Sequence, residues 1–301
     1  MKNLTDYIAE AYEYNYNISN VPKYTSTGTD KVDIKNKTNN KTNYTVQPKN
    51  KDELMYIITS TFKIKQYDLN FIDTSKITDM SELFININHN FDVSKWDVSN
   101  VTNMSQMFYY CKNFDCDLSN WDVSNVKDMS YMFTYCFKFN CDLSNWDVSN
   151  VTNMNHMFFS CVNFDIKCFE SWDVSNVKDM SYMFTYCFKF NCDLSNWDVS
   201  NVTDMKHLFN GCSIFIGKGL ENWDVSKVTD MTCMFSGCKN FNCDLSNWDV
   251  SNVKDMYALF RKCNKVTGKG LENWDVSKVT DMRYMFNDCD ILTIPSWYDK
   301  L

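Results

Sequence analysis

Three features are scarce or missing in this sequence, and each excludes a class of protein. Only 7 glycines and 3 prolines occur in 301 residues, too few for a fibrous or linker-like chain. No run of 18 apolar residues occurs, so the sequence has no candidate membrane-spanning helix. Residues 1–20 lack the hydrophobic stretch of a secretory signal, which favours an intracellular protein over a secreted one. In such a reducing compartment we expect the 14 cysteines to be free thiols.

The charge of the chain is acidic and unevenly distributed. The net charge is −8, and residues 1–95 hold 12 basic and 12 acidic side chains, so the whole excess lies in residues 96–301. An acidic surface repels nucleic acid and anionic membranes. We therefore expect a protein partner or self-association, no nucleic acid and no membrane insertion.

A tandem repeat dominates the sequence. Trp-Asp-Val-Ser recurs eight times at steps of 25 or 26 residues, and a degenerate ninth copy has Ile72 in place of the tryptophan. We call each repeat a coil, number its positions from the tryptophan at 0, and call one position in successive coils a column. The tryptophan column is Trp96, Trp121, Trp146, Trp172, Trp197, Trp223, Trp248 and Trp274. Because one such unit cannot bury its apolar face alone, the repeats predict a solenoid of about nine stacked coils.

Each coil carries two apolar patterns. Val101, Met104, Phe108 and Cys111 lie three or four residues apart, which predicts a short helix at +5 to +15. Apolar residues then alternate at +18, +20 and +22, which predicts one or two short parallel strands. The expected fold class is therefore an α/β repeat.

The repeats divide the chain into four parts. Residues 1–50, rich in Asn, Lys, Thr and Tyr, are expected to form a flexible arm. Residues 51–67 contain an apolar pattern typical of an amphipathic capping helix. Residues 68–289 form the tandem-repeat solenoid, and residues 290–301 form a C-terminal cap in which Pro295 suits a last strand.

The repeat unit Trp-Asp-Val-Ser-Asn-Val-x-Asp-Met-Ser-x-Met-Phe-x-x-Cys-x-x-Phe-Asn resembles the BspA-like family of leucine-rich-repeat surface proteins. The segment from Asp68 to Met80, which begins the repeats, resembles that family's first repeat. The resemblance implies a leucine-rich-repeat-like solenoid with a role in adhesion or protein interaction. It is typical of bacterial surface proteins and of giant viruses of amoebae, and the missing secretory signal favours the viral kind, placed in a virion or host cytoplasm.

Twelve cysteines fall in two columns. The +15 column is Cys111, Cys136, Cys161, Cys187, Cys212, Cys238, Cys263 and Cys289, and four more lie at +20. The spacing Cys-x4-Cys lacks the usual zinc pattern and no histidine recurs with it. We interpret these thiols as small buried apolar groups, with a metal ladder as the alternative.

Aspartates also form a column that could be an exposed ladder, at +1: Asp97, Asp122, Asp147, Asp173, Asp198, Asp224, Asp249 and Asp275. Stacked carboxylates bind calcium in some repeat proteins, but with glycine-rich turns that are scarce here. We favour turn and helix-start capping, in which Asp and Ser accept backbone N–H groups, over a calcium-binding module.

Nothing in the sequence assembles a catalytic centre. The three histidines are His89, His156 and His207, and the last two share the +10 position two coils apart, which favours packing in the repeat surface. We therefore predict no enzyme and no cofactor, but a nonenzymatic interaction or assembly scaffold, with a secreted adhesin as the main alternative.

Overall fold

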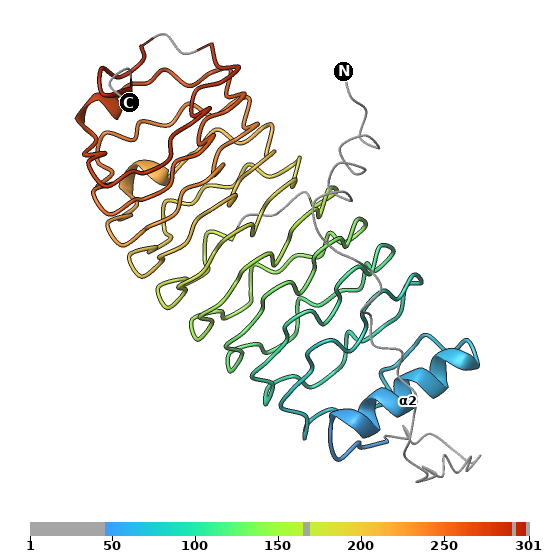
Figure 1. Cartoon of the computed structure of the whole chain (residues 1–301). Coiled ribbons are helices and arrows are strands. Elements are labelled where there is room, and N and C mark those ends of the chain that lie inside the picture. Colours follow the sequence, from blue (N-terminus) through green and yellow to red (C-terminus); the bar gives the residue numbers. More distant parts are fainter. Residues whose placement is uncertain (1–45, 165–168, 291–292, 299–301) are drawn as a thin grey trace, which may run out of the picture. The chain divides into compact units, whose positions relative to one another are not determined.

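The structure is a computed structural model that describes residues 46–164, 169–290 and 293–298. The expected arm therefore lies outside the described residues, except for its last five. Among the described residues there is one α-helix, α2 (Lys51–Lys63), and two 3₁₀-helices, η2 (Leu220–Asn222) and η3 (Leu271–Asn273) (Figure 1). The rest consists of turns and extended segments.

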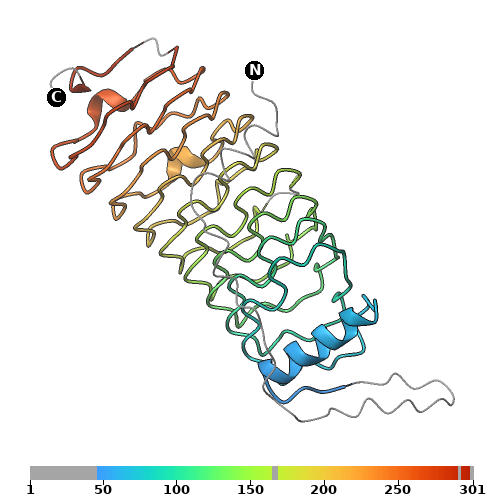
Figure 2. The same ribbon diagram turned by 45° about the vertical axis from the view of Figure 1, so that its right-hand side comes forward.

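Successive coils lie side by side and pair in parallel, as two views show (Figures 1 and 2). The pairing is a chain of isolated β-bridges down the +7 column. It joins Asp79, Asn103, Asp128, Asn153, Asp179, Asp204, Asp230, Asp255 and Asp281. Equivalent residues at +7 therefore pair across every boundary between these coils, and each sequence column becomes a row of residues in neighbouring coils.

The helix expected at +5 to +15 is not formed. Instead, alternate N–H groups donate to the next coil, as Met104 does to Asp128 at 2.9 Å and Phe108 to Met132 at 3.0 Å. Residues at +10 and +14 have positive φ, for example Gln106 at 56° and Tyr110 at 61°. A right-handed helix requires negative φ at every residue, so these two positions interrupt it in each coil.

A run of tight turns produces the same spacing of apolar residues that a helix would. Within a coil, Cys111 N–H donates to the Phe108 carbonyl three residues earlier, at 3.0 Å. Such turns return the chain to the same face every three or four residues, so Met104, Phe108 and Cys111 all point inward and are fully buried. The apolar spacing alone could not distinguish these turns from a helix.

The strands expected at +18 to +22 are also absent from the part of the chain that the structure describes. Phe114 and Leu118 are buried as the alternation predicts, but the parallel pairing lies at +7 instead. Where a coil has an extra residue, Gly219 takes a φ of +94° and begins η2. A Cβ there would lie 2.2 Å from the Ser195 nitrogen of the preceding coil, so only glycine fits this close approach.

Helix α2 covers the first coil. Its N-cap Asn50 accepts the Glu53 N–H at 3.0 Å, and the helix buries Leu54, Ile57 and Ile58 against the core. Val46, at the end of the expected arm, pairs with Ile72 of the first coil. Val46 therefore pairs with the first coil, and Asn50 caps α2.

At the C-terminal end, the tryptophan column continues one coil beyond the last recognised repeat. The Trp297 ring stacks on Trp274 at 6.5 Å, and its Nε1 donates to the Leu271 carbonyl at 2.8 Å. Trp121, Trp146 and Trp172 make the equivalent bond, each to the carbonyl three residues before the preceding tryptophan. The C-terminal segment thus extends the tryptophan column, which its changed sequence concealed.

Candidate interaction surface

The tryptophan column and the +15 cysteine column, except for the partly exposed Cys289, lie inside the coils. Every tryptophan from Trp96 to Trp274 is at most 5% exposed. Each +15 thiol donates to the +12 carbonyl of the preceding coil, as Cys136 does to Phe108 at 3.0 Å. Burial raises the pKa of the Cys111 thiol to about 12, so the thiolate that binds metals or attacks electrophiles is suppressed.

The +1 aspartates are exposed along the whole column. Each accepts the backbone N–H of the serine two residues later, as Asp122 does from Ser124 at 3.1 Å. Hydrogen bonds from the Ser124 hydroxyl and backbone lower the pKa of Asp122. Within the described ranges, no group of three His, Cys, Asp or Glu side chains could hold a metal ion.

A contiguous aromatic surface lies over the coils that begin at Trp96, Trp121, Trp146 and Trp172. Its rings come from +10, +13, +14 and +16 and are half-buried. Neighbouring rings touch across coil boundaries, for instance Tyr135 with Phe159 at 5.3 Å and Phe159 with Tyr186 at 5.9 Å. We call this surface the aromatic face: Tyr109, Tyr110, Tyr131, Tyr135, Phe137, His156, Phe159, Tyr182, Tyr186 and Phe188, with His207 continuing the +10 column.

The centre of the aromatic face is an unbroken stack of four +10 rings. Tyr131, His156, Tyr182 and His207 follow one another with centroids 4.3, 4.2 and 4.5 Å apart and nearly parallel planes. Burial lowers the pKa of His156 to about 3 and that of His207 to about 4. Both imidazoles are therefore neutral near pH 7, and the stack carries no positive charge of its own.

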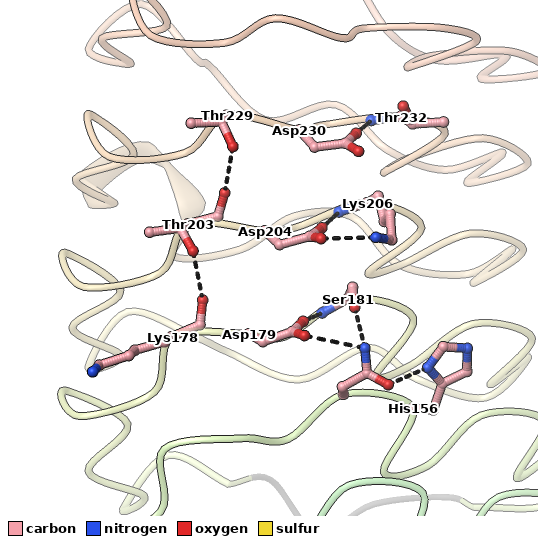
Figure 3. A network of polar contacts seen from close by, with 11 residues as sticks. His156, Lys178, Asp179, Ser181, Thr203, Asp204, Lys206, Thr229, Asp230 and Thr232 are labelled. Atoms are coloured by element: carbon pink, nitrogen blue, oxygen red, sulfur yellow. Dashed lines mark hydrogen bonds and ion pairs between the residues drawn. The ribbon is translucent and has the colours of Figure 1, made fainter.

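The +7 carboxylates Asp179, Asp204 and Asp230 form a row through successive coils, with His156 near Asp179 (Figure 3). The Asp179 carboxylate accepts the Ser181 N–H at 2.8 Å and the Asn155 side-chain N–H at 3.2 Å. The side-chain oxygen of Asn155, Oδ1, lies 2.5 Å from His156 Nδ1. Backbone turn, carboxylate row and ring stack are thus connected across adjacent coils.

Three aspartates of the +7 row form ion pairs with Lys or Arg side chains of the chain itself. Lys206 pairs with Asp204 at 2.8 Å, Arg283 with Asp281 at 2.6 Å, and α2 contributes Lys51 to Asp79 at 3.5 Å. Two cations also lie over tyrosine rings, Lys112 over Tyr110 at 4.4 Å and Arg283 over Tyr257 at 5.7 Å. Carboxylates and rings on this side of the coils are therefore suited to Lys and Arg side chains.

Sequence reasoning noticed the shared position of His156 and His207 but missed the aromatic face. The signal was present, because Tyr131 and Tyr182 occupy +10 in the coils just before those of His156 and His207. The positions of the aromatic face do not carry an apolar residue in every coil, so a search for columns of constant residue type did not detect them. Among the described residues, no helix is long and apolar enough to cross a membrane.

Comparison with protein-family models matches one family over most of the chain. The model is described as Mycoplasma protein of unknown function, DUF285, and it matches residues 53–168, 142–218 and 211–298. The three matches follow one another along the repeats and together extend from α2 to Tyr298. No curated protein and no solved structure matches the chain.

Proposed function

The chain belongs to the DUF285 family, and on that premise we propose that it is a nonenzymatic binding scaffold: a leucine-rich-repeat-like solenoid of the BspA-like kind whose repeated surface holds a protein partner. The parallel bridges at +7 and the stacked rows of Trp and Phe support the solenoid. Its coils are built from turns, so we propose no helix within them.

The aromatic face is the observation that carries the proposed function. Monomeric proteins rarely leave a broad aromatic surface half-exposed, and tyrosine is enriched at the centres of protein interfaces. The face extends over four neighbouring coils, so a partner gains many similar contacts. Affinity then comes from the sum of weak contacts and not from one residue.

The +14 column allows a test with substitutions that the chain already tolerates. Ser160 occupies +14 in the coil between those of Tyr135 and Tyr186, with the same positive φ. The triple variant Tyr110→Ser, Tyr135→Ser, Tyr186→Ser should fold and lose most captured partner, whereas Tyr135→Ser alone should keep most of it.

The matched control changes three exposed side chains in the same coils. Asp97→Asn, Asp122→Asn and Asp173→Asn keep the turn at +1 and should leave capture unchanged. Capture is measured by quantitative mass spectrometry, with circular dichroism to confirm folding. Equal loss in the control, or unchanged capture by the folded +14 triple variant, refutes the aromatic face as the binding surface.

A further inference from the structure

The +7 row has a pattern of charge that the aromatic face alone does not reveal. Asn103 and Asn153 are neutral, and Asp204 is paired with Lys206. Asp128 and Asp179 form no ion pair with any Lys or Arg among the residues that the structure describes. Uncompensated carboxylates therefore alternate with neutral positions from Asn103 to Asp204.

From this pattern we propose that the aromatic face binds an extended basic segment of a protein partner, which places one Lys or Arg beside Asp128 and Tyr131 and the next beside Asp179 and Tyr182. The inference rests on the proposed function and specifies the chemistry of the partner. We expect the partner segment to be cationic because the chain's excess acidic charge lies in residues 96–301.

The protein contains related contacts of its own, in which a cation lies between a +7 carboxylate and a tyrosine of the preceding coil. Lys206 occupies +9 and reaches Asp204 at +7 within the same coil, beside the Tyr182 ring of the preceding one. Arg283 at +9 pairs with Asp281 and lies over Tyr257 of the preceding coil. In the coils of Asp128 and Asp179, the +9 residue is instead a serine, which carries no charge to pair with the carboxylate.

The spacing sets the sequence that such a partner needs. Coils paired in parallel lie about 4.8 Å apart, so Asp128 and Asp179, two coils apart, are separated by about 10 Å. A polyproline segment advances about 3.1 Å per residue and has three residues per turn, so every third side chain lies on the same face and meets every second coil. The neutral His156 between the two tyrosines adds stacking surface without repelling the cations.

The binding test uses three synthetic peptides of twelve residues. One has four Lys-Pro-Thr units, the second has the same composition with all four lysines at one end, and the third has Gln in place of each Lys. We expect the periodic peptide to bind most tightly by fluorescence anisotropy and to weaken as salt is raised. Equal binding of the Gln peptide points to a neutral ligand and overturns the proposal, and equal binding of the clustered peptide overturns the spacing.

Two pairs of variants locate the contact. Asp128→Asn with Asp179→Asn copies the native Asn153 and should weaken the periodic peptide about tenfold, while Asp122→Asn with Asp173→Asn, in the same coils, should not change its affinity. Ser130→Lys with Ser181→Lys copies Lys206 and should block binding. Its control, Asn125→Lys with Asn176→Lys, copies the native Lys227 and adds the same charge on the +4 column.

The outcomes separate the two proposals. Equal losses in both members of a pair would mean unspecific charge attraction and would refute the basic segment. If no peptide binds but the +14 triple variant still loses its partner, the scaffold stands and the partner is not a basic segment. If the +14 triple variant also retains its partner, both proposals fail.

Discussion

Cys136 donates its thiol hydrogen to the carbonyl oxygen of Phe108 in the preceding coil, with 3.0 Å between sulfur and oxygen. The same carbonyl accepts the Cys111 N–H at 3.0 Å, so it is fully used. Equivalent bonds recur down the +15 column, for example from Cys161 to Phe133 and from Cys187 to Phe158. Cysteine at +15 is thus a small buried group that also joins adjacent coils, and every described cysteine is a free thiol.

This arrangement predicts the order in which the thiols react. Cys141, Cys243 and Cys289 are partly exposed, whereas Cys136 and Cys212 are fully buried. In the native protein, alkylation should reach the first three slowly, because burial raises their pKa values, to about 11 for Cys141 and about 12 for Cys243. The interior thiols should react only after unfolding, which peptide mapping by mass spectrometry can follow. Labelling of Cys136 and Cys212 at the rate of Cys141 in the native protein would contradict the interior placement.

Lys262 distinguishes the observed turns from the helix that the sequence suggests. It is exposed at +14 with φ of +61°, where the coils of Gly211 and Gly237 carry glycine. Lys262→Gly should therefore leave the free energy of unfolding unchanged or raise it by up to about 1 kcal/mol. In a helix the same change would cost about 1 kcal/mol.

A β-branched residue provides the opposite control at the same site. Lys262→Val should lower the free energy of unfolding by about 1–2 kcal/mol, because valine at positive φ is strained. Urea denaturation of the two variants measures the sign of each change in the free energy of unfolding. A stability order of Val above Gly would contradict the left-handed conformation at +14.

The two stacked histidines predict a dependence of stability on pH. Burial lowers the folded-state pKa of His156 to about 3 and of His207 to about 4, below the value of about 6.5 in an unfolded chain. Protons therefore bind the unfolded chain more readily, so this contribution to stability is complete above about pH 6.5 and falls as the pH drops toward 4 and 3.

The matched variant uses the residue found in neighbouring coils. His156→Tyr with His207→Tyr copies Tyr131 and Tyr182, which hold the same positive φ. Between pH 6.5 and 4.5 the melting temperature of the wild type should fall more than that of the variant. Parallel curves would mean that the histidines are not buried in the stack.

Trp197 separates ring packing from hydrogen bonding in the tryptophan column. Its ring stacks on Trp223 at 6.4 Å, and its Nε1 donates to the Phe169 carbonyl at 3.0 Å. Trp197→Ala should lower the free energy of unfolding by about 3–5 kcal/mol through the cavity it leaves. Trp197→Phe removes the hydrogen bond to the Phe169 carbonyl. It should lower the free energy of unfolding by less, about 1 kcal/mol, because that carbonyl still accepts the Trp172 N–H.

Chemical denaturation of the two Trp197 variants measures both costs. Because the tryptophan is buried, partner capture per folded molecule should be the same in Trp197→Phe as in the wild type. A folded Trp197→Phe variant that binds nothing would place the function in the tryptophan column and not on the aromatic face.

The sequence by itself determined the repeat length, the columns and which side chains are buried. Trp121, Met129 and Cys136 recur at fixed positions, and a residue that recurs in a stack meets its own copy, so burial of one predicts burial of all. The amphipathic segment that forms α2 was equally evident, because Leu54, Ile57 and Ile58 lie on one helical face.

Only the tertiary structure decided the backbone between those side chains. Turns with positive φ at Gln106 and Tyr110 keep the spacing of a helix, but they release alternate N–H groups to bond the next coil, a gain that no single repeat contains. The same stacking placed His156 between Tyr131 and Tyr182 and beside Asp179, which lie 23 to 26 positions from His156 in the sequence. Local pattern fixes which side chains face inward, whereas contacts between coils fix the backbone path and assemble the surface.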